Sequence, residues 1–217
     1  MAGLRRTFAF FLAALVLASA GASAEGPETK KLPDPDKTGG KPLMQALAAR
    51  HSSRSFSRAE LSDEVLSNLL WAAFGVNRPD GKRTAPSAMN WQEIDIYVAV
   101  ADGLYVYDAG AHALNLVSAE DVRAATGTQS FVADAPVNLV YVADLAKMGS
   151  ASDENKTIYS AADTGFIAQN VYLFCASEGL SAVVRGSIDK PALGEKLNLR
   201  SDQKIILAQT VGYPGGE

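Results

Sequence analysis

The chain has few of the side chains that bind metals. Its 217 residues include one cysteine, Cys175, and two histidines. A structural zinc site usually takes four cysteine or histidine ligands, so the sequence predicts no metal centre. One cysteine also excludes a disulfide within the chain, and the apolar helical pattern around Cys175 favours its burial.

Concentrated positive charge is missing as well. The formal net charge is −4, and no run of like charges stands out. A nucleic-acid partner needs a basic face, so none is expected. The sequence also lacks a Gly-x-Ser-x-Gly elbow, a P-loop and a dinucleotide fingerprint, which argues against the enzyme classes that depend on them. With 47% hydrophobic and 20% charged residues, the composition is that of a globular protein.

Long hydrophobic runs are absent except near the N-terminus. Arg5 and Arg6 precede an apolar run from Phe8 to Ala18, and Ala22-Ser23-Ala24 has the small-x-small pattern of a cleavage site. A membrane span needs about 20 apolar residues, which this run does not reach. The pattern predicts a signal peptide over residues 1–24 and a periplasmic or secreted protein with no membrane contact after cleavage. A retained anchor helix is the alternative.

The signal leaves two export routes open. Arg5-Arg6-Thr7-Phe8 resembles a twin-arginine signal, which directs folded proteins. Ordinary secretion signals also begin with arginine pairs. Residues 25–41, which contain three prolines and Gly39-Gly40, predict an extended arm or linker, poorly ordered unless docked. Residues 42–217 are then one domain.

Hydrophobic periodicity predicts helices and strands in mixed order within this domain. Helices are expected over 42–49, 62–75, 118–125, 152–178 and 191–197. Strands are expected over 94–100, 104–107, 137–143, 181–184 and 205–210. This order is typical of an α+β fold around one sheet. His112 lies between strand signals with no carboxylate pattern beside it, and we expect a structural role for it.

The predicted helix over 152–178 carries a stripe of small or neutral residues at a spacing of three and four. The stripe consists of Ala161, Ala162, Gly165, Ala168 and Gln169, while Phe166, Val171, Tyr172 and Phe174 occupy other angles. A helix that is apolar on several faces is buried on several faces. This predicts helix packing across a subunit interface, with an internal central helix as the alternative.

Two segments carry polar groups suited to a ligand. In Arg50-His51-Ser52-Ser53-Arg54, two guanidinium groups flank hydroxyl donors, a combination that suits phosphate. In the segment 83–92, Ser87 and Asn90 lie just before a predicted strand. An amide can bind the polar edge of a flat heterocycle, although a structural turn is the simpler interpretation.

A third segment spans residues 179–186, where the long helix gives way to a strand. Val183 and Val184 could cover a ring face, and Gly186 permits close backbone approach. Taken alone, this is an ordinary helix–strand junction.

In this order, the three segments and the terminal Gly212-Tyr213-Pro214 resemble the FMN-dependent nitroreductase family, over about residues 43–214. The resemblance implies a three-layer α+β fold, with a central mixed, mainly antiparallel sheet flanked by helices. It also implies an intertwined homodimer with two FMN sites at the subunit interface.

The resemblance assigns roles by position. Arg50, His51, Ser52 and Arg54 would hold the phosphate and ring, and Ser87 and Asn90 would come from the partner subunit. Val183, Val184, Arg185 and Gly186 would cover the ring, with backbone N–H groups near N5 and O4. No protein nucleophile is needed, because the cofactor carries the redox chemistry.

The resemblance therefore predicts an exported FMN-dependent oxidoreductase that transfers hydride through N5 to or from a small organic substrate. A non-catalytic binding protein that has lost FMN is the alternative. Many family members have a basic residue soon after Gly-Tyr-Pro, whereas this chain continues only with Gly215-Gly216-Glu217. Arg185 is the second departure: its side chain either reaches N1 or O2, where it would raise the flavin potential, or faces solvent.

Overall fold

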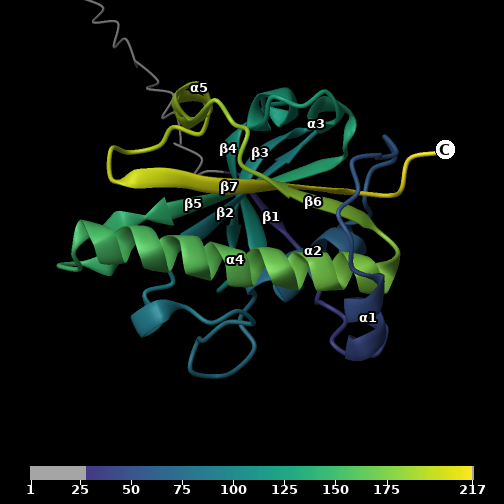
Figure 1. Ribbon diagram of the computed structural model, residues 1–217, viewed down its shortest axis with the longest axis horizontal. Helices are drawn as coiled ribbons and strands as arrows, with labels where there is room; N and C mark the ends of the chain where they lie inside the picture. Colours follow the sequence, from purple (N-terminus) through teal and green to yellow (C-terminus); the bar gives the residue numbers. More distant parts are fainter. Residues whose placement is uncertain (1–27, 217) are drawn as a thin grey trace, which may run out of the picture.

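A seven-stranded antiparallel sheet forms the centre of the molecule, with helices on both faces (Figure 1). The structure, a computed structural model, describes residues 28–216, so the predicted signal peptide over 1–24 lies outside the described residues. The strand order is β1-β4-β3-β2-β5-β7-β6. The bounds are β1 Thr29–Lys31, β2 Ile94–Val100, β3 Gly103–Asp108, β4 Ala113–Ser118, β5 Val137–Asp144, β6 Ser181–Arg185 and β7 Gln203–Gly212. The α+β prediction is confirmed, but all six strand pairs of this sheet are antiparallel rather than mixed.

Helices cover the sheet on both sides. One face carries α1 (Leu43–Ala49), α2 (Asp63–Phe74) and α4 (Asp153–Glu178), and the other carries α3 (Phe131–Asp134) and α5 (Lys190–Lys196) (Figure 1). Short 3-10 turns complete the chain: η1 Ala88–Asn90, η2 Arg123–Thr126 and η3 Leu145–Met148. Three layers result, as the resemblance implied.

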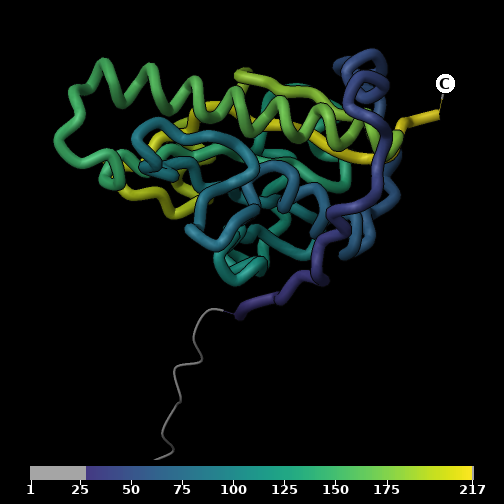
Figure 2. The backbone as a smooth tube through the Cα atoms, turned by 90° about the horizontal axis from the view of Figure 1, so that it is seen from below, coloured from purple at the N-terminus to yellow at the C-terminus, as the bar shows by residue number. Residues whose placement is uncertain are grey.

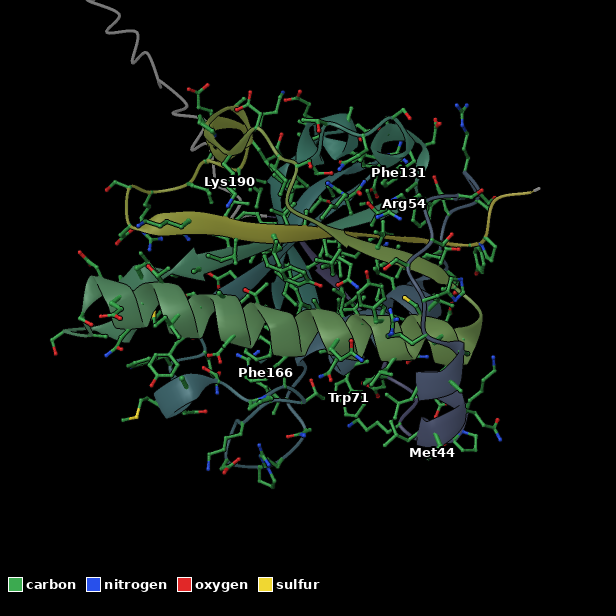
Figure 3. The ribbon with its side chains drawn as sticks, in the orientation of Figure 1. Met44, Arg54, Trp71, Phe131, Phe166 and Lys190 are labelled. Carbon is green, nitrogen blue, oxygen red and sulfur yellow. The ribbon has the colours of Figure 1, made fainter. Side chains whose placement is uncertain are left out.

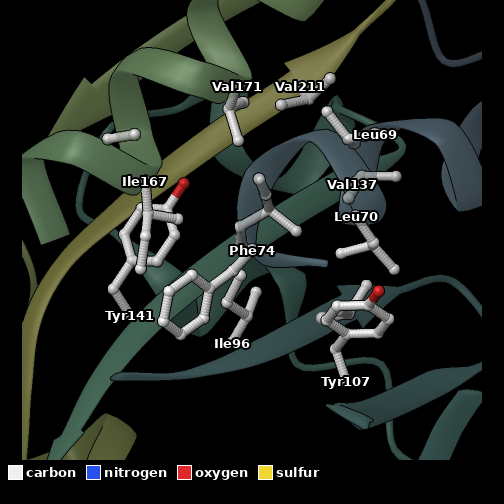
Figure 4. Packing of buried hydrophobic residues seen from close by; sticks show 14 of the residues in the cluster. Leu69, Leu70, Phe74, Ile96, Tyr107, Val137, Tyr141, Ile167, Val171 and Val211 are labelled. Carbon is white, nitrogen blue, oxygen red and sulfur yellow. The ribbon is translucent and has the colours of Figure 1, made fainter. Parts of the chain in front are cut away.

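The larger hydrophobic core lies between the sheet and the helices α2 and α4. Phe74 of α2 and Ile167 of α4 pack there with Ile96 and Tyr141 of the sheet (Figure 4). A second cluster lies under α5, where Leu193 and the adjacent Leu197 are buried. Burial of apolar surface at about 25 cal/mol per Å² makes these two interfaces the main source of stability.

The two long helices begin and end where the sequence predicts. The Ser62 hydroxyl accepts a hydrogen bond from Val65 N at the start of α2, and Ser152 does the same for Asn155 N in α4. These caps satisfy backbone donors that the first helical turn leaves free. Gly179 ends α4 with φ +72°, a left-handed conformation that glycine adopts without strain.

The arm predicted over 25–41 is docked in the part that the structure describes. β1 pairs with β4, and Leu32 is only 2% exposed. The Ser67 hydroxyl donates to Pro33 O at 2.6 Å and lies 2.7 Å from His112 Nε2. The other histidine nitrogen, Nδ1, lies 2.9 Å from the Tyr107 hydroxyl, so the structural role expected for His112 is confirmed. Figure 2 shows the arm running along the outside of the molecule to α1.

The helix predicted over 118–125 is wrong. Ser118 is the last residue of β4, a strand that the sequence analysis missed. β4 pairs with both β1 and β3, and this pairing decides the conformation of residues 113–118. The helical tendency that follows is limited to η2, where Asp121 binds the Arg123 backbone N–H and guanidinium instead of capping a longer helix.

Candidate functional site

The first predicted segment leaves α1 and runs beside the edge strand β6. α1 ends at Ala49, and the ψ of 120° at the capping residue Arg50 turns the chain out of the helix. Ser53 N then donates to Ala182 O at 3.0 Å. Since β6 is the last strand of the sheet, this bond uses part of its free edge. The contact brings the first and third predicted segments together within one subunit.

Tyr172 of α4 joins these two segments. Its hydroxyl accepts a hydrogen bond from Val184 N at 2.8 Å and lies 2.8 Å from Ser52 Oγ. Arg50 lies over its ring, with the guanidinium carbon 5.3 Å from the ring centroid. Either hydroxyl can donate in the Tyr172–Ser52 pair, and when Tyr172 donates, the Ser52 O–H is available to a ligand.

The sequence did not single out Tyr172 as part of the site. It appeared only among the bulky residues of the long helix, and no sequence pattern linked it to β6. Its role depends on the rotation of α4 against the sheet, which places the ring at the sheet edge.

The two arginines of the first segment are free of ion pairs in the described part of the chain, although Arg50 is half-buried over the Tyr172 ring. Arg54 is exposed (Figure 3). Within residues 28–216, neither Arg50 nor Arg54 forms an ion pair. The nearby Arg58, by contrast, pairs with Asp134 at 2.6 Å. His51 is exposed and binds Ala49 O through Nδ1 at 2.8 Å. This cluster can bind an anion without breaking an internal ion pair.

The third segment divides between the two faces of β6. Val183 is 2% exposed, whereas Val184 is half-buried and packs against the core on the α4 side. Its N–H already binds Tyr172. By strand alternation, Gly186 has the next outward-facing N–H beyond β6. Gly186 is exposed, and without a side chain it leaves the backbone accessible there.

Both predictions for the Arg185 side chain are wrong, because it neither faces solvent nor extends from the exposed edge. It is 5% exposed and points to the face opposite α4. Its guanidinium donates to the hydroxyl of Thr210 at 2.8 Å, to the side-chain oxygen of Asn138 at 2.7 Å, and to Thr126 through both the carbonyl and the hydroxyl. All of these acceptors are neutral. Burial accordingly lowers the pKa of Arg185 to about 10.

The second predicted segment is held in an unusual backbone conformation. Met89, Asn90 and Gln92 all have positive φ, at 51°, 56° and 49°. L-residues seldom adopt this region, and such strain clusters at functional sites. The Ser87 hydroxyl accepts from Gln92 N at 2.8 Å and donates to Glu93 at 3.2 Å, so it shapes the segment from inside. Asn90 is exposed, with its Oδ1 receiving a hydrogen bond from Gln92 Nε2.

Within one subunit, the second segment lies apart from the other two. It contacts α4 at Asp163, which accepts from Ala88 N at 2.9 Å, and at Tyr159, whose ring meets Trp91 edge-on at 5.8 Å. Tyr172 lies nine residues beyond Asp163 in α4, which corresponds to roughly 13 Å along the helix axis at 1.5 Å per residue. The described chain therefore gathers two of the three predicted segments, and Ser87 and Asn90 remain predictions for a shared site.

A groove of about 460 Å³ lies beside this site. Its walls include Lys37 of the arm, Leu43 of α1, Trp71 of α2 and Phe174 of α4. Lys37 Nζ lies 5.4 Å from the centroid of the Trp71 ring. Residues 28–216 contain no cluster of three or more histidine, cysteine or acidic side chains able to hold a metal ion. No helix in that range is both long and apolar enough to cross a bilayer.

Comparison with known proteins decides the family. The Nitroreductase family model matches residues 47–213, which span all three segments and most of the sheet. The chain belongs to the nitroreductase family. The predicted resemblance is thereby confirmed, and a nitroreductase-type oxidoreductase is the activity that this membership supports.

Two relatives carry the name putative nitroreductase. One, from Methanocaldococcus jannaschii, is 31% identical over 175 residues, covering 76% of this chain and 88% of the relative. The other is a crystal structure from Ralstonia eutropha JMP134 with 46% identity and a TM-score of 0.83, covering 87% of this chain and 90% of that one. A more distant nitroreductase-like fold is the NADPH:FMN oxidoreductase from Vibrio harveyi complexed with NAD+, at 20% identity and a TM-score of 0.62, covering 80% of this chain and 69% of that one.

Proposed function

We propose that this nitroreductase is an exported FMN-dependent enzyme that transfers hydride to or from a small organic substrate. The observation that carries the proposal is the pair of arginines without ion-pair partners among the described residues, Arg50 and Arg54, beside Ser52 at the outer edge of β6. Two guanidinium groups and a hydroxyl donor provide the charge and the hydrogen bonds that a phosphate monoester needs.

The residues of the site fit FMN by the chemistry of their donors. Arg50 and Arg54 would neutralise the phosphate, and the Ser52 hydroxyl, with Tyr172 donating to it, would add a neutral donor. The edge of β6 at Gly186 offers a backbone N–H where no side chain obstructs a flat ring. FMN, when bound, supplies the two-electron redox chemistry, so the protein's part is to bind, orient and tune it.

We propose further that a second copy of the chain completes each site. Three large side chains support this: Met89 is 82% exposed, Ile158 is 53% exposed and Phe166 is 48% exposed. Phe166 points away from the sheet, on the outer face of α4 (Figure 3). Large apolar side chains exposed in this way are typical of interfaces when they gather on one face. A partner packed on this face of α4 would also bring a second Ser87–Asn90 segment to the edge of β6.

Export is proposed from the sequence of residues 1–24 alone. The positively charged start, the short apolar run and Ala22-Ser23-Ala24 support a cleaved signal and a periplasmic or secreted location.

The direct test is FMN binding by the purified mature protein. We expect flavin absorbance in the visible range, and we expect the double variant Arg50→Ala, Arg54→Ala to bind FMN at least about a hundredfold more weakly, since each charge-assisted bond contributes roughly 1.5–3 kcal/mol. Arg58→Ala is the matched control, because Arg58 is already paired with Asp134, and it should leave the Kd unchanged. A colourless protein that does not bind added FMN would instead support the non-catalytic alternative.

A further inference from the structure

Two buried carboxyl groups hold the strained segment Ser87–Gln92 at two successive residues. Glu93 is 0% exposed and Asp163 is 1% exposed. The Ser87 hydroxyl donates to Glu93 Oε2 at 3.2 Å, and Ala88 N donates to Asp163 Oδ2 at 2.9 Å. Glu93 follows the segment in the chain, whereas Asp163 comes from α4. The segment is therefore fixed between the start of β2 and the long helix.

The two carboxyl groups bind successive residues of the segment, Ser87 and Ala88, and the charge of Asp163 acts on Glu93. Two ionised carboxylates in one buried site repel each other, and a single proton held by the pair removes this repulsion. Glu93 Oε1 is fully buried and has no donor partner among the described residues, which makes it the oxygen left to carry that proton. Burial raises the pKa of Glu93, and the charge of Asp163 raises it further.

Two basic side chains contact the segment, Lys147 and Arg83, and both bind groups other than the Glu93 and Asp163 carboxyls. Lys147 Nζ of η3 contacts Asp95 Oδ1 at 2.6 Å and Gln92 O at 3.5 Å. Arg83 of the preceding loop donates to Gln92 Oε1 and Phe74 O. On the β5 side, Asp144 N binds Glu93 O, and the Asp144 side chain pairs with Arg200. Within residues 28–216, no lysine, arginine or histidine side chain forms an ion pair with Glu93 or Asp163.

The segment needs such an anchor because its backbone is strained. Three positive φ values within four residues, at Met89, Asn90 and Gln92, would relax if the ends were free. With both carboxyls ionised, like charges would face each other in a buried site, which is unfavourable.

We propose that Glu93 and Asp163 share one proton and act as a clamp that holds Ser87–Gln92 in its strained shape, and that loss of this proton at alkaline pH releases the segment. Glu93 and Asp163 are thus positioning residues. The consequence for cofactor binding rests on the proposed function, because Asn90 lies on the clamped segment. The clamp itself does not.

Trp91 reports directly on the segment. In the Trp71→Phe background it is the only tryptophan, since the chain has two. We expect its fluorescence in the FMN-free protein to change as the pH rises from about 5 to about 9, because its contact with Tyr159 is lost. Glu93→Gln keeps the shape and a donor toward Asp163 but cannot ionise, so it should abolish the transition. Glu154→Gln, an exposed carboxylate on the same helix, should leave the transition unchanged.

Infrared spectroscopy gives a second readout. At neutral pH the parent should show a carboxylic-acid C=O band that is missing in Glu93→Gln, and in Asp163→Asn the band should titrate at lower pH because the neighbouring charge is gone. An identical fluorescence transition in parent and Glu93→Gln, or no acid band in the parent, would overturn the clamp. If the clamp is confirmed but FMN does not bind at any pH, the proposed function fails while the clamp stands.

Discussion

The hydroxyl groups of Tyr172 and Ser52 lie 2.8 Å apart although 120 residues separate them in the chain. The same Tyr172 oxygen accepts from Val184 N, so one side chain of α4 fixes the relative position of the Arg50–Arg54 segment and the edge of β6. No hydrogen bond other than Ser53 N to Ala182 O joins these two parts directly among the described residues.

Tyr172→Phe should therefore weaken the connection between the Arg50–Arg54 segment and β6. The variant leaves Val184 N–H without its acceptor and Ser52 without its partner, which costs about 1–2 kcal/mol. We expect FMN to bind about tenfold more weakly, measured by quenching of flavin fluorescence. Ser52→Ala and the double variant complete a cycle that isolates the pairwise energy. Additive effects of the two single changes would contradict a coupling between these hydroxyls.

Gly165→Leu distinguishes an effect on subunit association from an effect on the stability of one subunit. In one subunit, a Cβ at Gly165 would meet no atom within 4 Å, and leucine favours a helix over glycine by up to about 1 kcal/mol. The isolated subunit should therefore not lose stability. Overpacking a close helix approach should weaken association by about 1–3 kcal/mol, measured by sedimentation equilibrium.

Gly194→Leu on α5 provides the control for this change, because α5 lies on the opposite face of the sheet (Figure 1) and a Cβ there meets only Leu199 at 4.0 Å. Sedimentation of the flavin-loaded wild type as a monomer would refute the shared site.

Local signals predicted much of the fold. Ser62, Ser152 and Gly179 mark helix ends through their own hydrogen-bonding or conformational preferences, so the sequence alone locates α2 and α4. The central strand β5 is a mostly apolar run that is buried along its whole length, and such a run bounded by turns is consistent with a buried strand.

Elements that depend on distant partners were not predictable in this way. β1 is three residues long and becomes a strand only because β4 is beside it. β4 was not predicted, because its conformation depends on two pairing partners, β1 and β3. The positions of the Tyr172 and Arg185 side chains likewise depend on how α4 packs against the sheet and on which face of β6 each residue lies. No residue spacing in the sequence specifies either.

Arg185→Leu should destabilise the fold rather than act on a ligand directly. The change removes the donors that Thr210, Asn138 and Thr126 share, and each buried acceptor left unpaired costs about 1–3 kcal/mol. We expect the free energy of unfolding to fall by about 3 kcal/mol in a urea titration.

Arg185→Lys keeps the charge but not the planar fork of donors, so it should show an intermediate loss. A stability equal to wild type in both variants would show that the buried network contributes nothing.

Arg5→Lys combined with Arg6→Lys tests the export route. The variant keeps the charge of the signal, so a general secretion signal should tolerate it. A twin-arginine receptor should reject it, because lysine lacks the planar guanidinium. We expect the folded, yellow precursor to accumulate uncleaved in the cytoplasm, visible by size on an immunoblot. Normal cleavage of the variant would point to the general route and to cofactor uptake after export.

Both edges of the sheet are protected by segments from the first quarter of the chain. On one side the edge strand is β1, which is only three residues long and carries Lys30 and Lys31, and on the other side the Arg50–Arg54 segment lies along β6. Uncovered strand edges pair with those of other molecules and lead to aggregation. Since the cover of β6 is the segment proposed to hold the phosphate, losing the cofactor would free that edge, and keeping the protein soluble in storage would then depend on keeping FMN bound.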